Sequence, residues 1–246
     1  MKKKYFREFL LISIVIIIGI HSGNTDTQAQ FFGNPVALEE KTWSIGAAYD
    51  FQKYDFDGHE YSSIRSELKV DFALNKYLNT ALYIGTANLR ILYPLSRDLD
   101  EFRARIVPAF GGSVKGVFPV PNLSTLKVFT EAGIYRFNPH GTTFASSDPE
   151  KEEVYLDITW REFWGAAGVI YRTKTVFDTY IGVQTRAIMQ NEKVSRNGYN
   201  SGAWLSLISG FDLRMPGKFA LSAQCRVLNG YAFSVGISQT GLLTKN

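Results

Sequence analysis

The sequence predicts an all-β protein, an antiparallel up-and-down transmembrane β-barrel of about ten strands, with eight as the smaller possibility. Three observations support this class. Apolar and polar side chains alternate with the period of two that is typical of strands. Longer and shorter connections also alternate along the chain, which would gather the long ones at one end of an antiparallel sheet. Finally, the N-terminus has the features of an export signal.

Residues 1–29 have the three parts of a signal peptide. A basic start is followed by an apolar run from Phe9 to Ile20 and by a small-residue step that ends at Ala29. We expect cleavage after Ala29, because the apolar run is too short to span a membrane comfortably. Removing this segment takes away four basic and two acidic side chains, so the formal net charge falls from +4 to +2.

Residues 30–40 form a short periplasmic leader in this interpretation, because Pro35 argues against a central strand. Residues 41–246 then form the barrel. No Lys/Arg-rich tract follows the signal, so the sequence predicts no nucleic-acid partner. The single cysteine, Cys225, excludes an intramolecular disulfide.

The clearest strand is 64–74, because its charges and its apolar side chains have opposite parity. One face carries Arg65, Glu67, Lys69 and Asp71, and the other carries Leu68, Val70, Phe72 and Leu74. A helix would scatter these charges around its axis. Similar alternation, in places less regular, predicts the other strands near 43–51, 78–88, 102–116, 126–137, 155–171, 177–187, 203–213, 219–227 and 231–238.

The connections between these strands differ in length. Polar loops are expected at 54–61, 138–153 and 191–200, with a further connection at 93–100. Turns are expected at 75–77, 118–122, 172–175 and 215–218, and Asn229-Gly230 is a strong hairpin signal. With an even number of strands, both ends of the barrel domain lie on the side of the turns.

The polar faces predict a side-chain-filled interior with charges of both signs. The lumen-facing network is expected to contain Arg65, Glu67, Lys69, Asp71, Arg103, Arg105, Glu131, Gln184, Arg186 and Arg226. The apolar faces, including Cys225, would then meet lipid. Aromatic residues near strand ends would form girdles at the headgroups, namely Trp43, Tyr77, Trp160, Tyr171, Phe177 and Tyr231.

Alternation alone leaves a second architecture open. A soluble exported barrel or sandwich would turn the apolar faces inward and bind a small apolar ligand. The export signal and the loop lengths favour the membrane barrel.

Across its mature length the chain resembles small Gram-negative outer-membrane β-barrel proteins, and its Thr-Gln-Ala-Gln-Phe segment resembles exported proteins of the Bacteroidetes type. This resemblance implies a location in the outer membrane, with membrane lipid, lipopolysaccharide and the barrel-insertion machinery as partners. Members often end on an aromatic residue, whereas this chain ends Gly-Leu-Leu-Thr-Lys-Asn. The implied role is structural, surface-interacting or narrowly transporting.

An outer-membrane hydrolase, omptin-like or modifying lipid A, is the alternative. The mature chain offers His59 and His140, with Asp55 and Asp57 beside the first, as a base and its orienting carboxylates. Two solvated loop histidines are the favoured explanation of these residues, and no nucleophile elbow or phosphate-binding loop occurs. The acidic run 148–153 fits a solvated loop. The sequence therefore predicts no catalytic residue, no cofactor and no metal site.

Overall fold

The computed structural model describes residues 42–56, 59–92, 101–144, 153–173, 176–192, 198–200, 204–227 and 230–241. The expected signal peptide 1–29, the leader 30–40, the acidic residues 148–152 and the C-terminal residues 242–246 lie outside this described part. So do Asp57 and the connections 93–100, 145–152 and 193–197.

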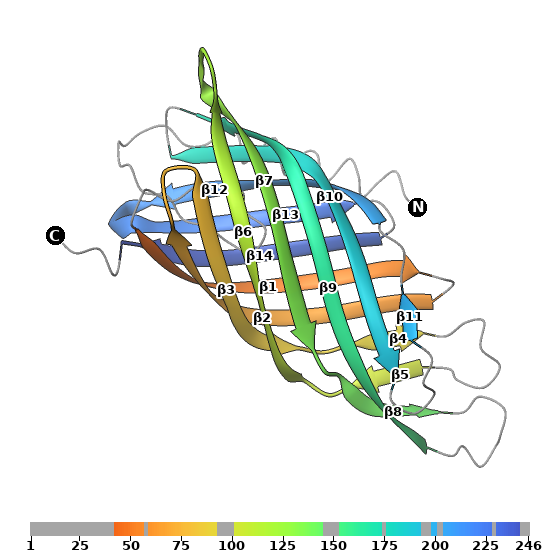
Figure 1. Cartoon of the computed structure of the whole chain (residues 1–246). Helices are drawn as coiled ribbons and strands as arrows, with labels where there is room; N and C mark the ends of the chain where they lie inside the picture. Colours follow the sequence, from red (N-terminus) through yellow and green to blue (C-terminus); the bar gives the residue numbers. More distant parts are fainter. Residues whose placement is uncertain are drawn as a thin grey trace, which may run out of the picture.

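The described chain is a closed antiparallel barrel (Figure 1). Its strands are β1 (Trp43–Phe56), β2 (His59–Ala73), β3 (Leu78–Ala87), β4 (Arg90–Leu92), β5 (Glu101–Ala104), β6 (Val107–Val120), β7 (Leu123–Phe137), β8 (His140–Phe144), β9 (Glu153–Arg172), β10 (Phe177–Glu192), β11 (Gly198–Asn200), β12 (Trp204–Met215), β13 (Phe219–Val227) and β14 (Gly230–Thr240). One 3₁₀ turn, η1, covers Pro216–Lys218. Among the described residues, no helix is long and apolar enough to cross a membrane.

Ten strands form the ring, in the order β1, β2, β3, β6, β7, β9, β10, β12, β13 and β14. Pairing of β14 with β1, from Ser44↔Thr240 to Tyr54↔Gly230, closes it. The short strands β4, β5, β8 and β11 continue β3, β6, β7 and β12 at one end, where β4 pairs with β2 and β5 pairs with β8. The predicted ten-stranded antiparallel barrel is thus confirmed.

The two ends of the barrel differ. We call one the turn end, because the connections 74–77, 121–122 and 216–218 lie there, together with the end of β9, the start of β1 and the end of β14. The other is the loop end, where β4, β5, β8 and β11 project (Figure 1). The expected alternation of long and short connections fails at the first hairpin. Residues 54–56 and 59–61 belong to strands and not to a polar loop, since β1 and β2 stay paired up to Phe56↔His59.

The exterior of the barrel is apolar between its ends. We call the apolar belt the exposed outward side chains of the ring, which include Ile45, Leu68, Leu82, Ile84, Phe110, Val114, Ile134, Phe163, Ile181, Met189, Leu207 and Val235. Cys225 has the outward parity predicted for it, between the buried Gln224 and Arg226. Apolar side chains therefore face out and polar ones face in, which is the reverse of a soluble ligand-binding barrel.

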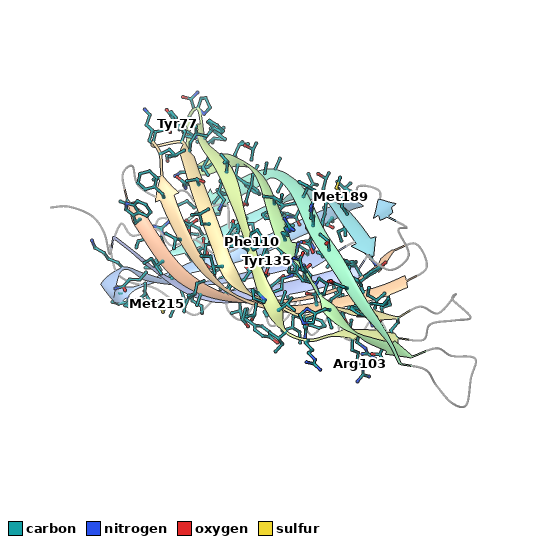
Figure 2. All side chains as sticks on the ribbon, turned by 60° about the horizontal axis from the view of Figure 1, so that its bottom comes forward. Tyr77, Arg103, Phe110, Tyr135, Met189 and Met215 are labelled. Carbon is teal, nitrogen blue, oxygen red and sulfur yellow. The ribbon has the colours of Figure 1, made fainter. Side chains whose placement is uncertain are left out.

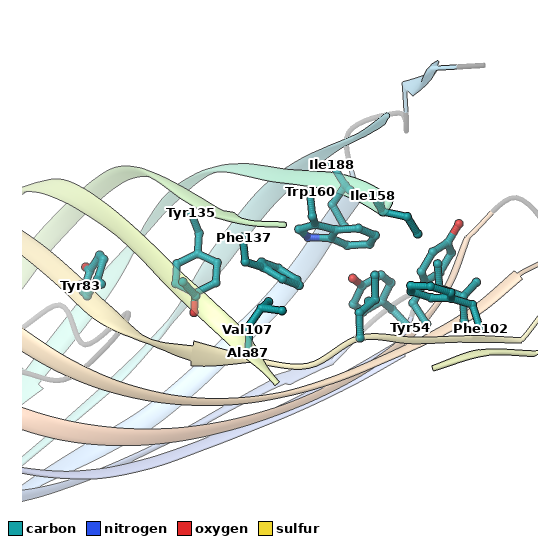
Figure 3. Close-up of a cluster of buried hydrophobic side chains, with 14 of the residues drawn as sticks. Tyr54, Tyr83, Ala87, Phe102, Val107, Tyr135, Phe137, Ile158, Trp160 and Ile188 are labelled. Carbon is teal, nitrogen blue, oxygen red and sulfur yellow. The ribbon is translucent and has the colours of Figure 1, made fainter. Parts of the chain in front are cut away.

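Two apolar clusters lie inside the barrel. The larger, at the loop end, is built around Trp160 and contains Tyr54, Tyr61, Leu89, Ile91, Phe102, Val107, Phe137, Leu156, Ile158 and Ile188. Figure 3 shows its side chains following one another along the barrel from Tyr83 through Tyr135 and Phe137 to Trp160 and Phe102. The smaller cluster, nearer the turn end, contains Val117, Phe129, Ile170, Tyr180 and Ile208.

Glycines make room for the interior aromatic side chains. The Phe129 ring lies against Gly168 and Gly182, which pair directly across β9 and β10. A Cβ on Gly182 would lie 2.4 Å from the carbonyl oxygen of Ala167 and 3.0 Å from Phe129 Cζ. Gly165, on the same strand pair, has no atom closer than 3.5 Å to such a Cβ.

We expect Gly182→Ala to destabilise the barrel by about 1–3 kcal/mol, because the added methyl group must displace backbone or the Phe129 ring. Gly165→Ala is the matched control and should change stability by less than about 0.5 kcal/mol. Urea titration of refolded protein, followed by the gel mobility of the folded form, measures both variants. Equal midpoints for the two would contradict this packing argument.

Candidate functional site

The interior is densely charged. Among the described residues, seven carboxylates and six cations are buried, so their charges nearly cancel. They are Asp50, Glu67, Asp71, Glu131, Glu162, Asp178 and Asp212 with Arg65, Lys69, Lys115, Arg186, Arg214 and Arg226. Eight of the ten residues expected in the lumen are buried there, namely Arg65, Glu67, Lys69, Asp71, Glu131, Gln184, Arg186 and Arg226.

Glu162 of β9 is the centre of this network. Both of its oxygens accept hydrogen bonds from Arg65, with Nη1 3.1 Å from Oε2, and both side chains are almost completely buried. The Trp160 indole donates to Oε1 at 2.8 Å, and Arg186 Nη1 lies 3.4 Å from Oε2. The Arg65 guanidinium also stacks over Tyr135, 4.5 Å from the ring centroid. Such a carboxylate fixes three neighbouring side chains at once.

A second set of contacts crosses the barrel to β13 and β14. Gln52 accepts from Arg186 and donates to Asp50, and Asp50 accepts from Ser234. Arg226 then donates to Gln184 at 3.2 Å. These bonds join strands far apart in the sequence into one polar layer.

Ion pairs continue toward the turn end. Lys69 Nζ lies 2.9 Å from Asp71 Oδ1, so Lys69, unlike Arg65, pairs within strand β2. Lys115 and Glu131 stand directly opposite each other on β6 and β7. Near the last turn, Asp178 contacts both Arg214 and Arg172. The interior is therefore crossed by ion pairs over much of its length.

Two expected lumen residues are on the outside instead. Arg103 is 70% exposed and Arg105 is also exposed, and Figure 2 shows Arg103 pointing away from the barrel at the loop end. The reason is a break between β5 and β6. Arg105 and Ile106 are consecutive exposed residues, so the alternation slips by one position, as a β-bulge would cause. Phe102 therefore faces inward. Pro108 and Phe110, which have the same parity in the sequence and would share its face in an unbroken strand, face outward.

Arg103 belongs to a small ion cluster beyond the apolar belt. Its Nε and Nη2 donate to Glu101 at 2.6 and 3.0 Å, and Arg90 also contacts Glu101. Hydrogen bonding to Arg103 holds the pKa of Glu101 below its usual range, with Arg90 adding to the effect. Glu101 therefore stays ionised to a lower pH than a free carboxyl.

Sequence reasoning missed several interior residues, of which Glu162 matters most. The stretch 155–171 was predicted as a strand, and the structure confirms it. Trp160 and Trp164 share the parity of Glu162, so this face lacks the clear polar pattern that identifies the interior face of 64–74. Trp160 was expected in a headgroup girdle and is instead only 1% exposed, inside the barrel. Tyr77, Tyr171 and Tyr231 are exposed near strand ends as expected.

His59 and His140 do not come together. His59 begins β2, whereas His140 begins β8 opposite Asp157 on β9. At this end, β4 and β5 lie between β2 and β8. Among the described residues, no group of three or more His, Cys, Asp and Glu side chains could hold a metal ion.

The chain matches no protein-family model and no curated protein. Solved structures do share its architecture. The β domain of the Bordetella autotransporter BrkA aligns with a TM-score of 0.54 at 9% identity, over 82% of this chain and all of that one. An outer membrane channel from Pseudomonas putida F1 aligns at 0.48 and 10% identity, over 86% and 100%. The translocator domain of the autotransporter NalP from Neisseria meningitidis aligns at 0.46 and 10% identity, over 96% and 95%.

At these identities the likeness concerns the fold. Together with the closed ring, the apolar exterior and the charged interior, it defines the class. The chain has the fold of an outer-membrane β-barrel.

Proposed function

We propose that this chain is an outer-membrane protein that acts through its loop-end surface or as a structural component, and that its barrel does not conduct. It would be exported with a cleaved signal peptide, residues 1–29, and a short leader, as in exported proteins of the Bacteroidetes type. The insertion machinery for barrels would place it in the membrane. The observation that carries the proposal is that the exterior of the barrel is apolar while its interior is filled by buried side chains.

The interior is filled by two different kinds of contact. At the loop end, the Trp160 ring lies 5.6 Å from Tyr61 and 5.8 Å from Phe137, measured between centroids. On the turn-end side of the Trp160 ring, Arg65 is completely buried and contacts Glu162 and Tyr135. Hydrated ions would have to displace an aromatic cluster and then separate buried ion pairs, which supports a closed barrel.

Membrane fractionation tests the location. We expect the mature protein to stay with the outer-membrane fraction after an alkaline wash, because an apolar exterior inserted in lipid is not released by breaking electrostatic contacts. A peripheral outer-membrane protein that the wash does release serves as the control. Recovery of the chain in the soluble fraction would refute the location.

Planar-bilayer recording of the refolded protein tests the closed interior in the same preparation. We expect no discrete conductance steps, whereas a general porin reconstituted in parallel gives them. Reproducible steps from this chain would reassign it to a narrow transport role.

A further inference from the structure

Two arginines face each other on the outside of the barrel. Arg136 of β7 and Arg161 of β9 are direct cross-strand partners, and both have the outward parity. Side chains opposite each other on adjacent strands have Cβ atoms about 4.5–5.5 Å apart. Like charges in this arrangement repel each other, and here both side chains are also half-buried. The pair therefore costs stability unless an anion lies between the two guanidinium groups.

No described carboxylate pairs with either arginine. None of the ion pairs found among the described residues includes Arg136 or Arg161, and the Nε atom of each is buried without a hydrogen-bond partner. Among the described aromatic residues, Arg136 contacts the ring of Phe110, with its guanidinium 6.0 Å from the centroid. Other outward cations at the loop end differ, since Arg90 and Arg103 contact Glu101 and Lys53 contacts Glu60.

The position of the pair indicates what the anion is. Toward the turn end, the next outward residues on β7 and β9 are Ile134 and Phe163. On the adjacent strands, Phe110 of β6 pairs with Arg136 and Met189 of β10 pairs with Arg161. All four residues belong to the apolar belt. Toward the loop end, the next outward residues are Asn138 and Thr159. The two arginines thus lie at the edge of the belt, where phosphate groups of a lipid leaflet meet acyl chains.

We propose that Arg136 and Arg161 together bind a phosphate group of the lipid A headgroup of lipopolysaccharide. This inference rests on the proposed location in the outer membrane, with the loop end outward. Guanidinium groups bind phosphate through paired N–H donors, and the two Nη atoms of each arginine form such a fork. A phosphate monoester carries more charge than the phosphodiester of a phospholipid, which favours lipid A as the occupant.

Lipid titration of the refolded protein in neutral detergent tests the site without reference to its location in the cell. The probes are bisphosphorylated lipid A and its dephosphorylated form, with bound lipid measured by native mass spectrometry. We expect the dephosphorylated lipid to bind at least about tenfold more weakly, as the loss of charge-assisted hydrogen bonds implies. Arg136→Gln/Arg161→Gln should lose this tenfold preference, and Arg136→Lys/Arg161→Lys should keep part of it.

Lys53→Gln/Arg90→Gln is the matched control, because it removes two outward cations that already have carboxylate partners. It should keep the preference. The proposal also predicts that, without phosphorylated lipid, Arg136→Gln/Arg161→Gln is at least as stable as the wild type, because the repulsion is gone. If that double variant fails to refold, each single Gln variant is titrated instead.

Four results would overturn the proposal. Equal affinity for the two forms of lipid A would show that the phosphate group is not recognised. An unchanged preference in the Gln variant would show that the two arginines do not bind it. Equal binding of phosphatidylglycerol, or displacement by millimolar inorganic phosphate, would assign the site to another phosphate source. None of these results bears on the alkaline-wash experiment, so the two proposals fail separately.

Discussion

Glu162→Ala is expected to lower the free energy of unfolding of the refolded barrel by about 3–5 kcal/mol, the cost of removing one partner from a buried ion pair. The variant leaves the Arg65 guanidinium completely buried without its carboxylate and deprives Arg186 of a neighbouring anion. The Trp160 indole also loses its acceptor. Urea midpoints of refolded protein in detergent, read from the gel mobility of the folded form, measure the loss.

Glu60→Ala is the matched control, since Glu60 pairs with Lys53 on the exterior and both side chains are about one-third exposed (35% and 31%). An exposed pair contributes about 0–1 kcal/mol, so this variant should unfold close to the wild type. Arg65→Ala/Glu162→Ala should be less destabilised than the two single variants together, because neither member of this pair is then left buried without the other. If Glu162→Ala and Glu60→Ala unfold at the same urea midpoint, the buried charge network does not stabilise the barrel.

The ring of strands was predictable because each strand meets two different environments. In 64–74, charges at every second residue specify the interior face, and Leu68 and Val70 specify the exterior one. A shift of one residue would place four charges in the apolar belt, so parity and register are tightly constrained. The same constraint made the outward position of Cys225 predictable.

The interior partners were less predictable, since parity gives the face of a residue and not its distance to residues on other strands. Arg65 and Glu162 are separated by 97 positions and meet across the lumen. Trp160 is a large aromatic residue that would suit the headgroup region equally well, so its predicted place in a girdle was wrong. Space for the interior rings is provided by other strands, as where Trp164 lies over Gly133.

Arg103 and Arg105 show a different limit. Their prediction assumed that one parity continues from Phe102 to Phe110, and the break at Arg105 and Ile106 reverses it. A bulge adds one residue without a strong sequence signal. The prediction for the first hairpin was wrong for another reason. Polar residues at 54–61 suggested a loop, but Tyr54 and Tyr61 point inward and stack on each other, 5.5 Å apart between centroids, where β1 and β2 are still paired.

Trp160→Ala is the second variant for which we expect a large effect, again about 3–5 kcal/mol of lost stability. Trp160 has one of the largest fully buried side chains of the barrel, and its ring packs between Tyr54, Tyr61 and Phe137. Truncation leaves a cavity that ten paired strands cannot close, because the backbone ring fixes the diameter. Trp160→Phe keeps most of the packing and loses only the indole bond to Glu162, so it should cost about 1–2 kcal/mol.

Tyr231→Ala is the control for size, because Tyr231 is an exterior aromatic residue that is 52% exposed. It should cost about 1 kcal/mol or less. The same Trp160→Ala protein should still give no conductance steps, because Arg65, Tyr135 and Glu162 fill the next layer of the lumen. If Trp160→Ala unfolds at the same urea concentration as Tyr231→Ala, the aromatic cluster does not stabilise the barrel. If it conducts, Trp160 alone closes the lumen and the buried ion pairs beneath it leave a path for ions.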